Sequence, residues 1–248
     1  MKLITLGCSY TRDNYQDTWA DLLAKDHGFE LHNLAERGAG ADYVTKRLLT
    51  ANITKDDIVV IMWPSADRFD LWADKTTPHL LQDYVYASWP DGVQPRLIDL
   101  HGQRRLDHGY ILNGSVPRGY KHNYFKYFYS PFQVVHDWYV SIITAQLYLK
   151  SVGANFYMTS AFPIQCPISY HHGLFEIEPD IFEKIDQACF VDTQGFYVWA
   201  RNKNKPFLNS HYPATASHRE YVDVYLAPAV KKALDQRKQT KYNTESLT

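Results

Sequence analysis

The sequence has few cysteines, no excess of charge and no long hydrophobic run. Its three cysteines, at positions 8, 166 and 189, form neither a disulfide framework nor a C-x-x-C metal pair, which favours a reducing compartment. The 26 Lys and Arg nearly balance the 27 Asp and Glu, so nothing indicates a nucleic-acid-binding surface. No run approaches the roughly 18 apolar residues of a membrane span. The apolar start is also too short for a signal peptide, so we expect a soluble, cytoplasmic protein that binds neither nucleic acid nor membranes.

What the sequence does have is enough apolar surface for a core and many aromatic residues. Hydrophobic residues make up 45% of the 248, and there are 19 Tyr, 12 Phe and 6 Trp. This length and composition predict a single α/β domain over residues 1–236, with a long insertion at about 64–130 and a flexible tail at 237–248.

Strand and helix patterns alternate outside the insertion. Short apolar runs at 3–6, 29–34, 57–63 and 154–160 predict strands, and the run at 57–63 is typical of a central strand covered on both faces. Helical spacing is found at 18–25, 41–51, 131–152, 177–189 and 214–234. This alternation predicts right-handed crossovers and a parallel sheet.

Residues 64–130 interrupt this pattern and are rich in Tyr and Trp. A structureless loop of this length is rare in a compact domain. We therefore expect a folded insertion, with short helices or a hairpin, over the carboxyl edge of the sheet. Its aromatic density fits either an ordinary core or a stacking surface.

Ser9 directly follows the first predicted strand, in the run Gly-Cys-Ser-Tyr-Thr at 7–11. Ligand crevices of open α/β sheets lie beyond the carboxyl ends of their strands. A serine there can act as a nucleophile, and its own N–H can stabilise an oxyanion, if a histidine is within reach. The alternative interpretation is a turn serine or a helix cap.

The next two strands also end in polar or small residues. Gly38, after the second strand, lets the backbone approach a ligand and point an N–H at it, although strand-to-helix turns often need glycine anyway. After the third strand, Ser65 could donate a hydrogen bond into the crevice. Asp67 and Arg68 are read as a surface ion pair.

A candidate base precedes the last predicted helix. His211 lies in the run Asn-Ser-His-Tyr-Pro at 209–213, on a loop that could aim its imidazole at a hydroxyl from another strand. A lone loop histidine is more often simply solvated. His218, a few residues later, is expected early in the helix.

Taken in order, these segments resemble the four sequence blocks of the SGNH (GDSL-type) hydrolases. The resemblance covers about residues 1–65 and 130–235. The start Gly-Cys-Ser-Tyr-Thr, with Trp-Ala-Asp-Leu-Leu at 19–23, further resembles a branch of small bacterial and viral SGNH proteins. The resemblance implies a three-layer α/β/α sandwich of the flavodoxin type. It also implies a Ser–His pair assisted by an acid, and an oxyanion hole made by Ser9 N–H, Gly38 N–H and a side chain of the third block.

The chain departs from this family in its first and third blocks. Cys8 stands where the family usually has Asp after the first glycine. The third block usually reads Gly-x-Asn, with the asparagine as oxyanion donor. The corresponding stretch here is Pro-Ser-Ala at 64–66, so Ser65 is the nearest donor.

The fourth block departs as well. Asn209 stands where an Asp is expected, and an amide fixes the tautomer of His211 without stabilising its charged form. Asp192 or Asp67 are other candidates for the acid. Aligning on the proline at 213 instead places Tyr212 at the histidine position, which would leave Ser9 without a base.

These features predict a serine esterase or deacylase that acts through an acyl-enzyme on Ser9. The aromatic insertion suggests an O-acyl group on a sugar or glycan as substrate, and an alcohol acceptor would make the chain an acyltransferase. The alternative is a catalytically impaired SGNH-fold module that binds carbohydrate or a protein partner. No cofactor is expected, because no glycine-rich phosphate loop follows the first strand. No metal site is expected, because the His pair at 171–172 lacks carboxylates at ligand spacing.

Overall fold

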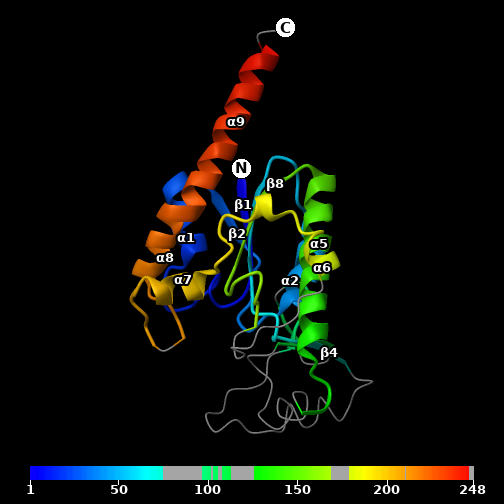
Figure 1. The fold of residues 1–248 in the computed structure, drawn as a ribbon. Coiled ribbons are helices and arrows are strands. Elements are labelled where there is room, and N and C mark those ends of the chain that lie inside the picture. The colour runs from blue at the N-terminus through cyan, green and yellow to red at the C-terminus, as the bar shows by residue number, and fades with distance from the viewer. Residues whose placement is uncertain are drawn as a thin grey trace.

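The centre of the molecule is a four-stranded parallel sheet in the order β2-β1-β3-β8. The computed structural model describes residues 1–74, 97–101, 103–105, 108–112, 126–168, 179–209 and 211–245. The four strands are β1 (Lys2–Leu6), β2 (Glu30–Asn33), β3 (Ile58–Trp63) and β8 (Asn155–Ser160). Helices cover both faces, as Figure 1 shows. The predicted three-layer α/β/α sandwich of the flavodoxin type is therefore confirmed.

β3 is buried along its whole length because it lies between β1 and β8. All six of its residues are buried. Val59 and Ile61 face one hydrophobic core, whereas Val60 and Met62 face the other. A strand covered on both sides has no polar face, which explains its continuous apolar sequence.

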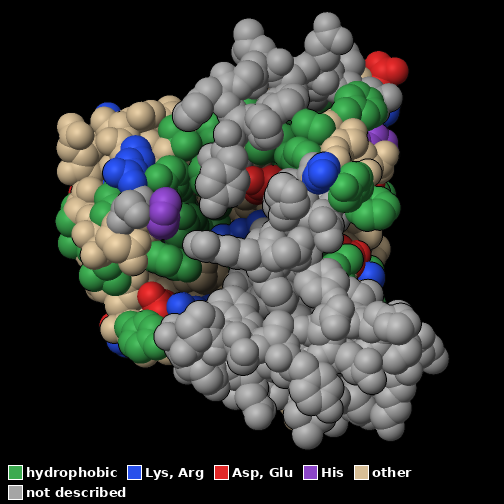
Figure 2. Space-filling model, turned by 90° about the horizontal axis from the view of Figure 1, so that it is seen from below, with side chains coloured by type: hydrophobic (Ala, Val, Ile, Leu, Met, Phe, Trp, Pro, Cys, Tyr) green, Lys and Arg blue, Asp and Glu red, His purple; other side chains and the backbone are tan. Residues whose placement is uncertain are grey.

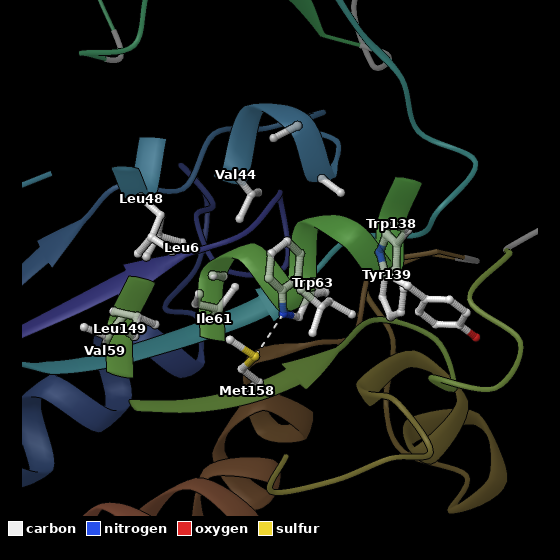
Figure 3. Close-up of a cluster of buried hydrophobic side chains, with 14 of the residues drawn as sticks. Leu6, Val44, Leu48, Val59, Ile61, Trp63, Trp138, Tyr139, Leu149 and Met158 are labelled. Atoms are coloured by element: carbon white, nitrogen blue, oxygen red, sulfur yellow. Dashed lines mark hydrogen bonds between the residues drawn. The ribbon is translucent and has the colours of Figure 1, made fainter. Parts of the chain in front are cut away.

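The first core lies between the sheet and the helices α2 (Ala41–Thr50) and α5 (Pro131–Val152). Figure 3 shows Trp63 of β3 at its centre, donating its indole N–H to the Met158 sulfur at 3.5 Å. The indole of Trp138 on α5 donates to the carbonyl oxygen of Pro64 at 2.8 Å. These bonds satisfy the polar edges of two buried rings and fix the chain where β3 ends.

The second core is covered by the first helix and by the C-terminal helices. They are α1 (Trp19–His27), α7 (Phe196–Asn202), α8 (Thr215–Tyr221), the π-helical turn Val222–Leu226 and α9 (Ala227–Glu245). Trp19, Phe196 and Tyr221 are buried together there. Among the described residues, no helix is long and apolar enough to cross a membrane.

The C-terminal segment differs from the expected frayed tail. Residues 237–245 continue α9. The guanidinium of Arg237 donates to the backbone carbonyls of Lys55 (2.8 Å), Asp56 (2.8 Å) and Asp57 (3.1 Å). This tertiary anchor supports a polar helix whose sequence has no amphipathic pattern.

The insertion contains a second, antiparallel sheet in the order β4-β7-β5-β6. Its strands are β4 (Asp70–Asp74), β5 (Leu97–Ile98), β6 (Arg104–Arg105) and β7 (His108–Leu112). The expected folded insertion is thus present in its described part. Most of the aromatic residues at 84–124 lie outside the described residues.

The prediction of a helix at 177–189 is wrong. The structure has only α6 (Pro179–Phe182) and a 3-10 turn (Gln187–Cys189), and residues 177–178 lie outside the described part. The side chain of Gln146 binds both backbone groups of Asp186, accepting from its N–H at 3.0 Å and donating to its carbonyl at 2.9 Å. This tertiary contact takes up the backbone groups that a continuous helix would use.

Candidate active site

Loops distant in sequence meet where the parallel strands end. The loop after β1 accepts a hydrogen bond at Gly7 O from the N–H of Glu36, in the loop after β2, at 3.2 Å. The Tyr10 hydroxyl donates to the backbone carbonyl of His211 at 2.8 Å, and the Tyr10 and Tyr212 rings meet edge to face. The structure thus brings together the segments that carry Ser9 and His211.

Gly7 allows the chain to turn sharply into the Ser9 loop. Its φ is +149°, and a Cβ placed on it would lie 2.6 Å from the backbone carbonyl oxygen of Met62 in β3. Only glycine fits there without moving the central strand. The Ser9 loop is therefore held directly against the end of β3.

Ser9 lies in the tight turn that follows. The N–H groups of Thr11 and Arg12 both donate to Cys8 O, at 2.9 and 3.1 Å. Ser9 is buried, with 4% of its surface exposed. Its hydroxyl makes no hydrogen bond to an imidazole within the described part of the chain, and so none to His211 or His218.

The backbone amides predicted for an oxyanion hole are available. The N–H groups of Ser9 and Gly38 make no hydrogen bond to any of the described residues. Gly38 has a φ of +85°, which explains the need for glycine in this turn. Free amides near a nucleophile are what a developing oxyanion requires.

Ser65, the third predicted donor, is committed elsewhere. It is buried, and its hydroxyl lies within hydrogen-bonding distance of Asp67 Oδ1 and, at 2.9 Å, of the carbonyl oxygen of Pro167. Its single proton is therefore used by Asp67 or by the loop after β8. Asp67 is buried as well, which corrects the prediction of a surface ion pair with Arg68.

Asn209 contacts the backbone of His211, not its imidazole ring. Asn209 Oδ1 accepts from the backbone N–H groups of His211 (2.9 Å) and Tyr212 (3.1 Å), so it shapes the loop. The His211 residue is exposed. The assisting role predicted for Asn209, which fixes the tautomer of the ring, has no counterpart in these contacts.

His218 is a core residue of α8. It is 1% exposed, its ring packs against Phe196, and its Nδ1 accepts from the backbone N–H of Trp19 at 3.3 Å. Burial lowers the pKa of His218 to about 4. The ring is therefore neutral near pH 7 and helps to satisfy the start of α1.

Asp192, another candidate acid, serves the second core. Its carboxylate accepts from the N–H groups of Gln194 (2.9 Å) and Gly195 (3.0 Å), and from the Tyr221 hydroxyl at 3.0 Å. The described part of the chain contains no hydrogen bond between Asp192 and a histidine. The contacts of Asp192 therefore link the loop after β8 to α8.

Arg68, expected at the surface, lies near the carboxyl ends of the strands and is half-buried. The buried Nη1 atom of its guanidinium has no hydrogen-bond partner among the described residues. Its charge acts on Cys8, Tyr10 and Tyr212, which flank Ser9 and His211. Burial lowers the pKa of Arg68, and these groups together with Asp67 raise it by more. An arginine is in any case charged near neutral pH. The Asp-Arg dipeptide alone gave no signal of this position.

Figure 2 shows the side of the molecule at which the parallel strands have their carboxyl ends. Basic and acidic side chains lie in a depression there. Among the described residues, no group of three or more His, Cys, Asp or Glu could hold a metal ion. What the described residues assemble is a buried serine, free backbone amides and a charged guanidinium.

Comparison with known proteins found similar structures but no sequence relative. No protein-family model matches the chain, and no curated protein is similar in sequence. Protein YxiM of Bacillus subtilis is 11% identical with a TM-score of 0.47, over 94% of this chain but only 56% of its own. The protein TesA is 14% identical (TM-score 0.45, 94% and 99% covered), and the acetyl xylan esterase AlAXEase is 12% identical (0.45, 90% and 96%). The fold assignment rests on the strand order and helical layers described above.

Proposed function

We propose that this chain is a serine ester hydrolase of the SGNH (GDSL) type, with Ser9 as the nucleophile. The observation that carries the proposal is that the N–H groups of Ser9 and Gly38 bond to none of the described residues, at the carboxyl ends of the strands, where the His211 loop also lies. This combination matches the requirements of acyl transfer, which are a hydroxyl, a base and oxyanion donors.

In the proposed reaction, Ser9 Oγ attacks the ester carbonyl carbon while His211 takes the hydroxyl proton. The carbonyl oxygen becomes an oxyanion that accepts from the N–H groups of Ser9 and Gly38. The tetrahedral intermediate collapses, the C–O bond to the alcohol breaks, and His211 returns the proton to the leaving alcohol. Water then hydrolyses the acyl-Ser9 ester by the same steps.

His211 is the proposed base, not His218. The Nδ1 of His218 already accepts from Trp19 N–H, and a histidine with a pKa of about 4 is a weak proton acceptor near neutral pH. The exposed ring of His211 has to turn toward Ser9 in the productive complex. The bond from Tyr10 to His211 O keeps its loop beside Ser9 for that movement.

For the substrate, we propose an O-acyl group on a sugar or glycan. Large aromatic side chains are exposed in and beside the insertion, including Trp72 (47%), Tyr127 (64%) and Phe128 (78%). Trp72 lies on β4, near the end of the molecule at which the parallel strands end, as Figure 1 shows. Exposed aromatic faces stack on the apolar faces of pyranose rings.

The experiment is covalent labelling with a fluorophosphonate, combined with hydrolysis of p-nitrophenyl acetate and acetylated xylan. We expect the unaltered protein to be labelled, Ser9→Ala to lose both labelling and turnover, and His211→Gln to lose about 100-fold or more in turnover. The half-buried Ser141→Ala and His136→Gln on α5 are matched controls outside the proposed site and should behave like the unaltered protein. Absence of labelling of folded protein would rule out the proposal.

The second candidate function is a non-catalytic binding module on the same fold. It is favoured by the missing hydrogen bond between Ser9 and an imidazole in the described residues, and by the use of Asn209 Oδ1 in the backbone of its own loop. This candidate predicts binding of the deacylated saccharide that survives both Ser9→Ala and His211→Gln. Turnover that both substitutions abolish would exclude it.

A further inference from the structure

Arg68 has a buried guanidinium nitrogen, Nη1, with no hydrogen-bond partner among the described residues. Its backbone N–H donates to Ser65 O at 3.2 Å, and its carbonyl oxygen would lie 2.8 Å from a Cβ placed on Gly40. Its backbone is therefore fixed beside the loop that contains Gly38. From there its charge acts on Cys8, Tyr10 and Tyr212. The guanidinium therefore lies within electrostatic range of the Ser9 and His211 loops.

The guanidinium has no partner that neutralises it through a hydrogen bond. Its buried Nη1 is unbonded, and Arg68 forms no ion pair within the described residues. The nearby arginine at position 12, by contrast, is bonded to Ala35 O at 3.3 Å and lies 3.5 Å from a carboxylate oxygen of Glu36. Arg68 as a residue is half-buried, but its Nη1 atom is buried. A buried charged nitrogen without a hydrogen-bond acceptor is costly, and an anionic ligand group would reduce that cost.

The charges nearby favour a monovalent carboxylate over a phosphate. Arg68 is the one cation that acts on Tyr10 among the described residues. Two acidic residues of the same segment, Asp67 and Asp70, also feel its charge. A dianion would bring two negative charges next to Asp67 and the partly ionised Asp70, whereas a carboxylate brings one, which a single guanidinium can balance with its planar fork.

We propose that Arg68 binds a carboxylate of the substrate next to Ser9, so that the preferred substrate is an ester that also carries a carboxylate. This inference rests on the proposed function for its placement at a reacting ester and names the substrate class more closely.

The test measures binding separately from turnover, in the Ser9→Ala protein. The probes are the monomethyl esters of succinic, glutaric and adipic acid, and the controls are the uncharged dimethyl esters. Titration followed by protein NMR should show at least one monoester binding about tenfold or more tightly than its diester. Arg68→Gln should abolish that preference, and Arg68→Lys should retain part of it.

Arg12→Gln is the matched control, since it removes a neighbouring arginine that already has a carboxylate partner. It should leave the preference unchanged, and thermal melts should establish that each variant is folded. If Arg68→Gln does not fold, the reduced preference in Arg68→Lys decides the matter. Equal binding of monoester and diester, no monoester binding, a preference that persists in the Arg68 variants, or equally strong competition by inorganic phosphate would each overturn the inference.

The two proposals fail in different ways. A protein that binds the monoester through Arg68 but hydrolyses no ester and takes up no fluorophosphonate contradicts only the proposed hydrolase. A protein that hydrolyses monoesters and diesters equally well contradicts only the role of Arg68.

Discussion

Replacing Gly7 with alanine tests how tightly the Ser9 loop is held against the central strand. The new methyl group would lie 2.3 Å from Thr11 Oγ1 and 2.6 Å from Met62 O. The threonine side chain can rotate away, but the carbonyl belongs to β3, which is buried along its length. Relief therefore requires the backbone of the Ser9 loop or of β3 to move.

Two costs add up in this variant. An L-residue at a φ of +149° carries about 1–3 kcal/mol of backbone strain. Overpacking a close contact costs about 1–3 kcal/mol more. A central value of about 4 kcal/mol corresponds to a melting temperature lower by about 8–16 °C for a chain of this size.

Gly28→Ala is the matched control. Gly28 also has a positive φ, +64°, but no atom lies within 4 Å of the position its Cβ would occupy. It should lose only about 1–2 kcal/mol from the left-handed conformation. Urea unfolding of the two variants measures the difference, and costs within about 1 kcal/mol of each other would refute the close approach of Gly7 to β3.

Three further predictions concern groups around the site. Burial raises the pKa of Asp70 to about 7, so between about pH 4 and 7 the folded state holds a proton that the unfolded state has lost. The free energy of unfolding should therefore fall as pH rises from about 4 to 7. Asp70→Asn should flatten this fall in thermal melts. Burial lowers the pKa of His218 to about 4, so between about pH 6.5 and 4 the unfolded state binds more protons than the folded state. The free energy of unfolding should therefore fall as pH drops from about 6.5 to 4. His218→Gln should remove this fall, and an unchanged slope would contradict the prediction. Tyr10→Phe removes the bond to His211 O and should cost about 1 kcal/mol, with faster amide exchange at His211, Tyr212 and Ala214. Unchanged exchange would show that this bond does not hold the loop.

The parallel sheet and the position of Ser9 could be predicted from local sequence. β3 is buried on both faces, so its residues had to be apolar in an unbroken run, which the sequence displays directly. Gly7 and Ser9 follow β1 immediately, and the end of a parallel strand is where a crevice forms. These features are set by burial and chain direction within a few residues.

The partners of polar side chains could not be predicted, because they depend on contacts between distant segments. The side chain of Gln146 makes hydrogen bonds to the backbone N–H and carbonyl of Asp186, and so the helix expected at 177–189 is interrupted. Arg237 binds carbonyls near position 56, and so a polar segment expected to fray continues α9. The same limit applied to His218, whose burial and bond to Trp19 N–H depend on α1 packing against α8.

The sequence by itself determined the layered α/β fold and the order in which the candidate residues follow the strands, since both depend on hydrophobic periodicity and on turns between neighbouring residues. Only the tertiary structure decided that Ser65 bonds to the carbonyl oxygen of Pro167 in the loop after β8, that Asn209 accepts from the backbone of its own loop, and that the buried Nη1 of Arg68 has no hydrogen-bond partner among the described residues. The physical reason is that a hydrogen bond or an unmet charge is a property of two groups in space, and these groups come from loops up to two hundred residues apart.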